Sequence, residues 1–420
     1  MEQTAKVQSS SYGWVVLVVT FIAGFTAPAN MAKAPALAPT LISTFGLQPS
    51  QFGYLVSVFF LLGFLLAFPT AAIIRKIGLR LAISFAVAFG AIGSILGAFS
   101  ATPDMFVLFV VGRLLEGAGM GIMGVAGASA ITPWFPKQKR GLPLGIWAVW
   151  VAAGMVVCPM LYSWMFAQAP SGLGMSISGI WLAVGIFDVV ALILFNIFYR
   201  QPTTPFDDAE VDKTKFQEGA KFKITDIFKS KALIALAFIF LFDEMAFMTI
   251  NGFFVEYQVN TFFSDWDPGL AQLQANIFVT AFAVSGAVFA PLAGKISDWV
   301  KSRKWVLFVG LCAGIIYTSV VMTNHIWELY WPITIVAGMT GGMVPAIIWI
   351  ATPETVPGKL VPSANALVAT TQNLGMFVGP LVMGYAIQFM GFSFATLICL
   401  VPLYIICMIF WIFGLRKAIK

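Results

Sequence analysis

Long apolar stretches follow one another along almost the whole chain, separated by short polar segments. A membrane-spanning helix needs about 20 mostly apolar residues, and the 420-residue sequence contains twelve stretches of this kind. We place them near residues 13–42, 52–73, 81–99, 104–131, 142–163, 177–199, 232–255, 270–296, 305–323, 329–351, 363–385 and 394–415. The first stretch is overlong and contains Pro28, Pro35 and Pro39, so we expect a kink in its second half. The pattern predicts an all-α, multi-pass membrane protein.

Two short motifs occur at equivalent points of the first and second six spans. They are Thr132-Pro133 and Thr352-Pro353, before the fifth and eleventh spans, and the segments Gly154 to Pro159 and Gly375 to Pro380 within those spans. The offsets are 220 and 221 residues, so one insertion relates the two matches. Parallel repeats of six spans are a common architecture of alternating-access carriers. The repeat therefore predicts two pseudo-symmetric six-helix bundles.

The longest polar segment lies between the sixth and seventh spans. Residues 200–231 mix seven cations with six acids, which is typical of a loop in water, with a short amphipathic helix near Ile224–Phe228. We therefore predict an N-terminal six-helix bundle over 1–199, a cytoplasmic linker over 200–231 and a C-terminal six-helix bundle over 232–420.

Positive charge is confined to one set of alternating loops. Of the 24 lysines and arginines, 22 fall on the side that also receives both termini, and the opposite loops carry acids only. Basic loops stay in the cytoplasm, so we predict a bacterial cytoplasmic (inner) membrane protein with both termini inside. The net charge of +6 is then a topology signal, and we expect the lipid bilayer and no nucleic acid as a partner.

Composition excludes several other classes of protein. Hydrophobic residues make up 60% of the chain and charged residues 10%, against about 25% charged in soluble domains. The four cysteines lie in apolar stretches and the only histidine, His325, lies in a loop, so we expect no metal site and no cofactor. The residues before the first span do not resemble a basic leader with a small-residue cleavage site, so we expect that no signal peptide is removed. Because no Ser/His constellation lies at membrane depth, an enzyme is not expected, and the linker is too small to be a sensor domain.

Arg113 and Glu116 stand out inside the fourth span. Charged residues within the membrane usually face a bundle interior or a water-filled cavity, and at this spacing the two side chains share one helical face. Arg113 lies nine residues into its span, ~14 Å deep at 1.5 Å per residue. Its guanidinium fork matches a carboxylate. It therefore either binds an anionic substrate or neutralises Glu116, and both roles can hold in different conformations.

Lys33 is the second cation at membrane depth, in the outer half of the first span. A lysine near a helix end can extend its ammonium group to the membrane surface. The neighbouring prolines favour an inward orientation instead, as a second cation for an anionic substrate. The sequence leaves both alternatives open.

Acidic residues at membrane depth are candidates for carrying protons. Asp243 and Glu244 are adjacent in the seventh span and point about 100° apart, so we expect one of them to face the cavity. Burial favours the neutral form of a carboxyl group. We assign proton coupling to Glu116, Asp243 or Glu244, and a structural hydrogen-bonding role to Asp188. With two cations and four acids, the fully ionised group has a net charge of −2, which requires either protonation or a bound cation.

Three motifs resemble those of the major facilitator superfamily, and the resemblance covers essentially the whole chain. The loop after the eighth span, Gly294-Lys295-Ile296-Ser297-Asp298 with Lys301, Arg303 and Lys304, is similar to the family's Gly-x-x-x-Asp pattern with its basic residues. After the second span, Ala71 and Arg75 stand in place of the glycine and the acid. In the fourth span, Arg113-x-x-Glu116-Gly117-x-Gly119 is similar to the family's Arg-x-x-Gln-Gly-x-Gly.

The region around the fifth span bears on the branch of the family. Trp134-Phe135-Pro136, with Arg140-Gly141 and Gly145, resembles the organic-anion, monocarboxylate, oxalate/formate and cyanate branches. The drug-antiporter pattern Gly-x-x-x-Gly-Pro-Gly is incomplete, because Cys158 replaces its second glycine and no glycine follows Pro159.

The resemblance implies roles for further residues. Arg75, Arg140 and Asp298 are gating candidates, and Asp298 is expected to latch the fifth span when the inside is closed, because a helix N-terminus favours a carboxylate. Apart from the resemblance, polar and aromatic side chains within the spans complete the expected cavity of Lys33 and Arg113: Trp150, Asn251, Trp349 and Gln372.

The sequence thus predicts a secondary active transporter that works by alternating access. Its expected cargo is a small organic anion of the carboxylate type, moved by proton symport or by anion exchange. The alternative is a proton-coupled exporter of a cationic or amphipathic compound, which would use Glu116, Asp243 or Glu244. We expect the protein to be a monomer.

Overall fold

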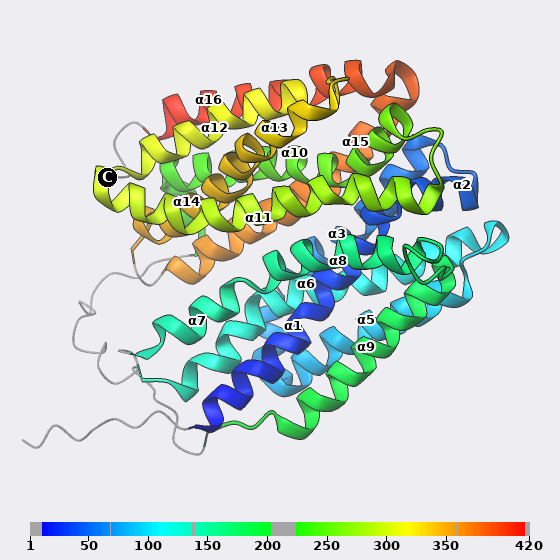
Figure 1. The fold of residues 1–420 in the computed structure, drawn as a ribbon. Helices are drawn as coiled ribbons and strands as arrows, with labels where there is room; N and C mark the ends of the chain where they lie inside the picture. The colour runs from blue at the N-terminus through cyan, green and yellow to red at the C-terminus, as the bar shows by residue number, and fades with distance from the viewer. Residues whose placement is uncertain (1–10, 68, 137–138, 203–223, 358–359, 416–420) are drawn as a thin grey trace, which may run out of the picture.

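The computed structural model describes residues 11–67, 69–136, 139–202, 224–357 and 360–415. Within these ranges the chain forms helices joined by turns and no β-strand (Figure 1). Eleven helical segments are long and apolar enough to cross a membrane, and the last of them extends over 52 residues. Gly391, with φ of 74°, interrupts that last segment and divides it into two spans. The twelve predicted spans are thereby confirmed.

Two groups of helices form the molecule, with the start of α1 and the end of α16 on the same side (Figure 1). The N-terminal group consists of α1 (Tyr12–Ala36), α2 (Ala38–Phe45), α3 (Pro49–Ala67), α4 (Thr70–Ile77), α5 (Leu79–Phe99), α6 (Phe106–Ile131), α7 (Gly141–Ala148), α8 (Trp150–Phe166) and α9 (Ile177–Phe198). The C-terminal group consists of α10 (Lys231–Phe262), α11 (Pro268–Val300), α12 (Arg303–Val320), α13 (Tyr330–Gly338), α14 (Val344–Ala351), α15 (Val361–Cys399) and α16 (Val401–Gly414). Most of the predicted linker lies outside the described residues, so its boundaries stay a prediction.

Some spans are interrupted where the sequence disfavours a regular helix. The predicted kink in the first span lies at Leu37, between α1 and α2, close to Pro39, which lacks the N–H that would continue the helix. The tenth span is α13 and α14 joined by a π-helical turn over Met339–Met343. This turn, which contains Gly341 and Gly342, was not predicted from the sequence.

The internal repeat has the same local structure in both halves. Thr132 begins a 3-10 turn after α6, and Thr352 begins one after α14. The Thr132 hydroxyl donates to Ala128 O at 2.7 Å, and the Thr352 hydroxyl donates to Ile348 O at the same distance. Each pair lies four residues apart, so the two Thr-Pro motifs end their spans in the same way.

The halves meet mainly through α3 packed along α15 and α8 packed along α11. The closest approach uses glycine: a Cβ on Gly53 of α3 would lie 2.3 Å from the carbonyl oxygen of Pro380 on α15. Nearby, Asn276 Nδ2 of α11 donates to Ala36 O at 3.0 Å and to Ser163 Oγ at 2.7 Å. The Gly53 and Asn276 contacts lie near α2, at the end of the molecule away from the start of α1 and the end of α16 (Figure 1), which we call the outer end.

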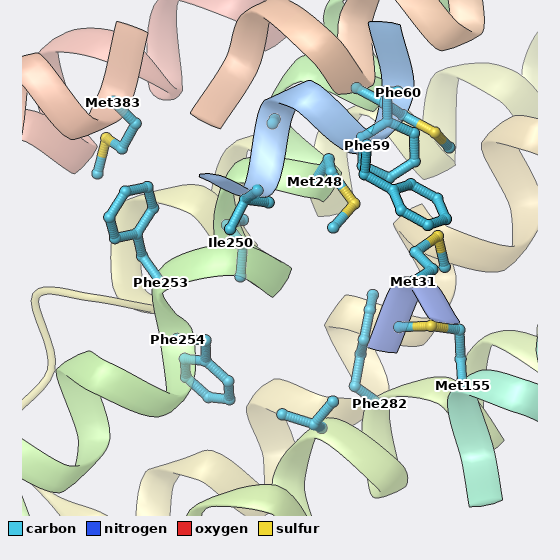
Figure 2. Packing of buried hydrophobic residues seen from close by; sticks show 14 of the residues in the cluster. Met31, Phe59, Phe60, Met155, Met248, Ile250, Phe253, Phe254, Phe282 and Met383 are labelled. Atoms are coloured by element: carbon cyan, nitrogen blue, oxygen red, sulfur yellow. The ribbon is translucent and has the colours of Figure 1, made fainter. Parts of the chain in front are cut away.

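The apolar core shows the same closure of the outer end. One buried cluster includes Met31, Phe59 and Met155 from the N-terminal half and Met248, Phe253 and Phe282 from the C-terminal half (Figure 2). At the end near the termini, the N-terminal half has a second cluster of its own, which includes Val16, Trp147 and Phe195. The halves are thus packed together at the outer end and at mid-depth.

Candidate transport site

Glu116 of α6 holds two cations at once. Its Oε1 lies 2.6 Å from Lys33 Nζ, and its Oε2 lies 2.5 Å from Arg113 NH1. All three side chains are at most 1% exposed. The predicted contact within the Arg113–Glu116 pair is confirmed, and Lys33 points inward to join it rather than reaching the membrane surface.

The cluster continues through uncharged groups to a second acid. Lys33 Nζ donates to Ser94 Oγ of α5 at 2.9 Å, and Ser94 Oγ donates to Asn30 Oδ1 of α1 at 2.6 Å. Asn30 Nδ2 in turn donates to Asp188 Oδ2 of α9 at 2.7 Å. The hydrogen-bonding role predicted for Asp188 therefore connects α9 to α1 and to the charged cluster.

Glycines and aromatic rings position the charged groups. A Cβ on Gly93 of α5 would lie 2.7 Å from Glu116 Cγ, so only glycine allows α5 and α6 to approach this closely beside the carboxylate. Lys33 Nζ lies 4.8 Å from the Trp181 ring centre, and the Arg113 guanidinium lies 4.8 Å from that of Phe59. Aromatic faces attract cations at such distances, so each cation has a ring on one side and a carboxylate on another.

The cluster is balanced in charge. It contains two cations, Lys33 and Arg113, and two carboxyl groups, Glu116 and Asp188. Arg113 Nε and Asp188 Oδ1 are buried and have no hydrogen-bond partner. The buried guanidinium of Arg113 therefore binds one carboxylate, that of Glu116, and keeps an unused N–H donor at Nε.

The two adjacent acids of α10 point to different helices, as their spacing predicted. Asp243 Oδ1 accepts a hydrogen bond from the Tyr404 hydroxyl of α16 at 2.8 Å, and that hydroxyl also lies 3.1 Å from Thr340 Oγ1 in the π-helical turn. Glu244 Oε1 accepts from Gln372 Nε2 of α15 at 2.8 Å, and Glu244 Oε2 has no partner.

The acids of α10 have only uncharged partners. In the described parts of the chain, the ion pairs of membrane-buried groups are those of Lys33 and Arg113 with Glu116. The formal charge of −2 deduced from the sequence therefore belongs to Asp243 and Glu244, in the C-terminal half.

Three residues expected in the substrate cavity have other contacts. Trp150 stacks on Trp147 with ring centres 5.2 Å apart, and Asn251 Nδ2 donates to Phe247 O of its own helix at 2.9 Å. Trp349 packs edge to face on Phe240. In the part of the chain that the structure describes, none of the three hydrogen-bonds to the Lys33–Arg113–Glu116 cluster, so their role in binding stays a prediction.

Comparison with known proteins bears directly on this arrangement. The family model of the Major Facilitator Superfamily matches residues 16–264 and, again, residues 245–420. The chain belongs to the Major Facilitator Superfamily. The resemblance found in the sequence motifs is confirmed.

Relatives within the superfamily are distant but match most of the chain. The probable galactarate/D-glucarate transporter GudP of Bacillus subtilis (strain 168) is 20% identical over 91% of this chain and 88% of its own length. The lysosomal dipeptide transporter MFSD1 of Danio rerio is 23% identical over 90% of this chain and 82% of its own. A solved bacterial homologue of the human lysosomal transporter Spinster, inward-facing and unoccupied, superimposes with a TM-score of 0.75 at 15% identity and covers 98% of both chains.

The residues of the superfamily's gating motif around the end of α11 form ion pairs within the C-terminal half. Asp298 Oδ1, near the end of α11, accepts from Arg303 NH1 at 3.0 Å, and Arg303 Nε donates to Glu354 Oε1 at 2.9 Å. Arg140, which precedes the fifth span, donates from Nε to Phe135 O at 2.8 Å, and Arg75 at the end of α4 is exposed. The expected latch between Asp298 and the fifth span stays a prediction for another conformation of this superfamily member.

The uncharged members of these networks were not predicted from the sequence. Asn30, Ser94, Thr340, Tyr404 and Asn276 are polar residues inside apolar helices, and each bonds a different helix. A count of polar side chains per span would have found them as candidates. Their partners could not have been assigned, because sequence separations of 64 to 240 residues leave the pairing open.

Proposed function

We propose that this superfamily member is a secondary transporter that moves a small organic anion of the carboxylate type across the bacterial cytoplasmic membrane. The observation that carries the proposal is the convergence of Lys33 and Arg113 on one carboxylate, that of Glu116. Charge-assisted hydrogen bonds from guanidinium and ammonium groups suit any carboxylate. A substrate carboxylate meets the same donors when Glu116 releases them.

Charge balance links this exchange of carboxylates to a driving force. Because isolated charge is costly in the membrane interior, an anion that enters the cluster must be matched by loss of negative charge elsewhere. Protonation of a carboxyl group gives proton symport, and departure of another anion gives exchange. Glu116, Asp243 and Glu244 are the carboxyl groups available for the first mode.

The relatives favour a carboxylate cargo. GudP is described as carrying galactarate and D-glucarate, and MFSD1 as carrying dipeptides. Sugar diacids and dipeptides differ in size and in net charge, but both bear carboxylate groups. The pair of cations in the N-terminal half can bind the carboxylate group that such cargoes share.

Alternating access needs two states with opposite ends closed. The structure has the outer end closed by α3 against α15 and by Asn276. With the termini in the cytoplasm, as the basic loops predict, this is the state that opens inward. In the opposite state we expect the outer contacts to separate and Asp298 to approach the fifth span. A monomer of two six-helix bundles suffices for this cycle.

A second candidate function rests on a different observation. Asp243 and Glu244 have no cation beside them among the described residues. A cationic or amphipathic compound bound there would balance their charge, which would give a proton-coupled exporter.

Flux measurements on purified protein in proteoliposomes separate the two functions. Labelled D-glucarate, lactate and a dipeptide are compared with a labelled amine, with and without a proton ionophore. We expect uptake of at least one carboxylate and no uptake of the amine. Transport of the amine with no carboxylate flux would show that the anion proposal is wrong and support the second candidate.

A further inference from the structure

Glu244 combines burial with an unused hydrogen-bonding position. Its side chain is 3% exposed, Oε1 accepts from Gln372, and Oε2 is buried without a partner. No lysine or arginine of the described residues forms an ion pair with it. A carboxylate in such surroundings is unfavourable, and binding of one proton removes the charge.

Asp243 lies next to Glu244 in the chain but has different neighbours. Its Oδ1 accepts from Tyr404, which also contacts Thr340, so Asp243 is tied to α16 and to the π-helical turn inside the C-terminal bundle. This network joins three spans of one half. Asp243 therefore serves as a connection within the bundle, away from the surface shared with the other half.

Glu244 lies close to the surface where the halves meet. Its partner Gln372 belongs to α15, which packs along α3 of the N-terminal half. The residue after Gln372, Asn373, contacts α3: a Cβ on Gly63 would lie 2.8 Å from Asn373 Oδ1. Glu244 is thus separated from the α3–α15 contact by one side chain, that of Gln372.

The seam between α10 and α15 holds Glu244 firmly. A Cβ on Gly375 of α15 would lie 2.3 Å from Leu241 O and 3.2 Å from Glu244 Cβ. A Cβ on Gly379 would lie 2.3 Å from Met245 O. Because the two backbones are this close, the carboxyl group stays beside Gln372 while the halves move.

The other titratable groups near the seam between α10 and α15 contact residues other than Glu244. From α16, Tyr404 and Cys407 face Asp243, the neighbour of Glu244 on the same helix. Across the interface, Lys33 and Arg113 are engaged with Glu116. From α15, the side chain that contacts Glu244 is the uncharged amide of Gln372.

We infer that Glu244 is the carboxyl group that carries the transported proton, with Gln372 as its positioning residue. One proton adds to the carboxylate when the site communicates with the more acidic side, and the same proton leaves from the other side, which restores the carboxylate. The inference rests on the proposed function in its symport mode. It assigns the two tasks to different halves, the anion to Lys33 and Arg113 and the proton to Glu244.

Infrared difference spectroscopy tests the proton site without any substrate. Wild type in lipid is compared at acid and alkaline pH, and the C=O stretch of a buried protonated carboxyl group is followed. We expect this band in wild type and in Asp243→Asn, and its loss in Glu244→Gln. A band that persists in Glu244→Gln and disappears in Asp243→Asn would overturn the inference.

A transport assay tests whether Glu244 couples proton movement to carboxylate uptake, with a matched control on the same helix. Glu256 of α10 also accepts from an amide, Asn260 Nδ2 at 2.7 Å, and also has an unpartnered Oε2, but it lies twelve residues away toward the outer end, about 18 Å along the helix. The probe is the labelled carboxylate that wild type takes up in the flux assay. For a monoanion carried with one proton, wild type and Glu256→Gln should accumulate it about tenfold per pH unit of gradient.

Glu244→Gln should accumulate no carboxylate and should still exchange internal for external label. Gradient-driven accumulation by Glu244→Gln equal to that of Glu256→Gln would refute the inference. If wild type itself exchanges the label but never accumulates it, symport is wrong as the proposed mode and Glu244 carries no transported proton.

Discussion

The two halves share a fold but differ in whether their buried charged side chains are paired with side chains of opposite charge. In the N-terminal half, Lys33 and Arg113 meet Glu116, and Asp188 completes a balanced network across α1, α5, α6 and α9. In the C-terminal half, Asp243 and Glu244 have only uncharged hydrogen-bond partners among the described residues. The repeat offset of 221 places Thr334 and Ala337, both uncharged, at the positions of Arg113 and Glu116.

Helix packing alone does not require this difference in buried charge between the halves. Pseudo-symmetric bundles would be equally stable with the same network in both halves. A carrier that binds an anion and a proton needs cations in one place and an isolated acid in another. The asymmetry is therefore best explained by function, and it yields predictions that distinguish the halves.

The largest expected effect is on stability, from removing the shared carboxylate. Glu116→Gln leaves two buried cations without their partner, and breaking a buried pair from one side costs about 3–5 kcal/mol. Glu244→Gln removes a charge that has no cation, so it should leave stability unchanged or raise it. Thermal unfolding of both variants in detergent compares them directly. Equal melting temperatures for the two variants would remove the proposed difference between the halves.

Arg113→Lys tests whether the fork of the guanidinium matters. NH1 of Arg113 bonds both Glu116 Oε2 and Asn30 O, the latter at 2.7 Å, while Nε has no partner. A substrate carboxylate can therefore be held by two N–H groups of the guanidinium fork, which a lysine lacks. Loss of one hydrogen bond to a charged group costs about 1.5–3 kcal/mol, or roughly 10–100-fold in KM for the carboxylate. A KM within twofold of wild type would indicate that Arg113 only neutralises Glu116.

Closure of the outer end depends on Gly53. Valine at this position would place its Cβ 2.3 Å from Pro380 O, so we expect about 1–3 kcal/mol of overpacking in the outer-closed state. Gly53→Val should shift the protein toward the outward-open state, measured by labelling of a cysteine introduced at mid-depth from the outer side. Gly124→Ala is the control, because a Cβ there meets no atom within 4 Å. Unchanged labelling in Gly53→Val would show that α3 and α15 do not form the outer gate.

The smallest effect is expected at Asn276. Its two amide hydrogens are shared among Ala36 O and Ser163 Oγ across the halves and Gln272 O of its own helix. The net loss across the halves is therefore about one hydrogen bond, or about 0.5–1.5 kcal/mol. Asn276→Ala should therefore raise the outward-open population roughly three- to tenfold. The same labelling assay measures it, with Asn251→Ala, which loses only a bond within its own helix, as the comparison. If both alanine variants give the same labelling rate, Asn276 does not hold the outer end closed.

The sequence predicted most of the architecture. Apolar stretches of the right length predicted the spans, and the repeated Thr-Pro motifs predicted two matching halves. The depth of Arg113, Glu116, Asp243 and Glu244 followed from simple counting along each span. These features are local, so they can be read from one segment at a time.

The partners of the charged residues could not be predicted. Lys33 binds a carboxylate 83 residues away, and Tyr404 binds one 161 residues away. The helices are apolar on all sides, so no periodicity indicates which face of each helix points inward. The choice between Asp243 and Glu244 likewise depended on the rotation of α10 against α15 and α16. The π-helical turn at Met339–Met343, which contacts α11 and α12, was not predicted either.

The most direct test of the account is whether a carboxylate can take the place of Glu116. The melting temperatures of wild type and of Glu116→Gln are measured with and without D-glucarate, and with acetate as a minimal carboxylate. If Lys33 and Arg113 form the anion site, Glu116→Gln lacks its internal competitor, so carboxylates should restore its stability and bind it more tightly than they bind wild type. A Glu116→Gln variant that is as stable as wild type, and that neither anion stabilises further, would contradict the account.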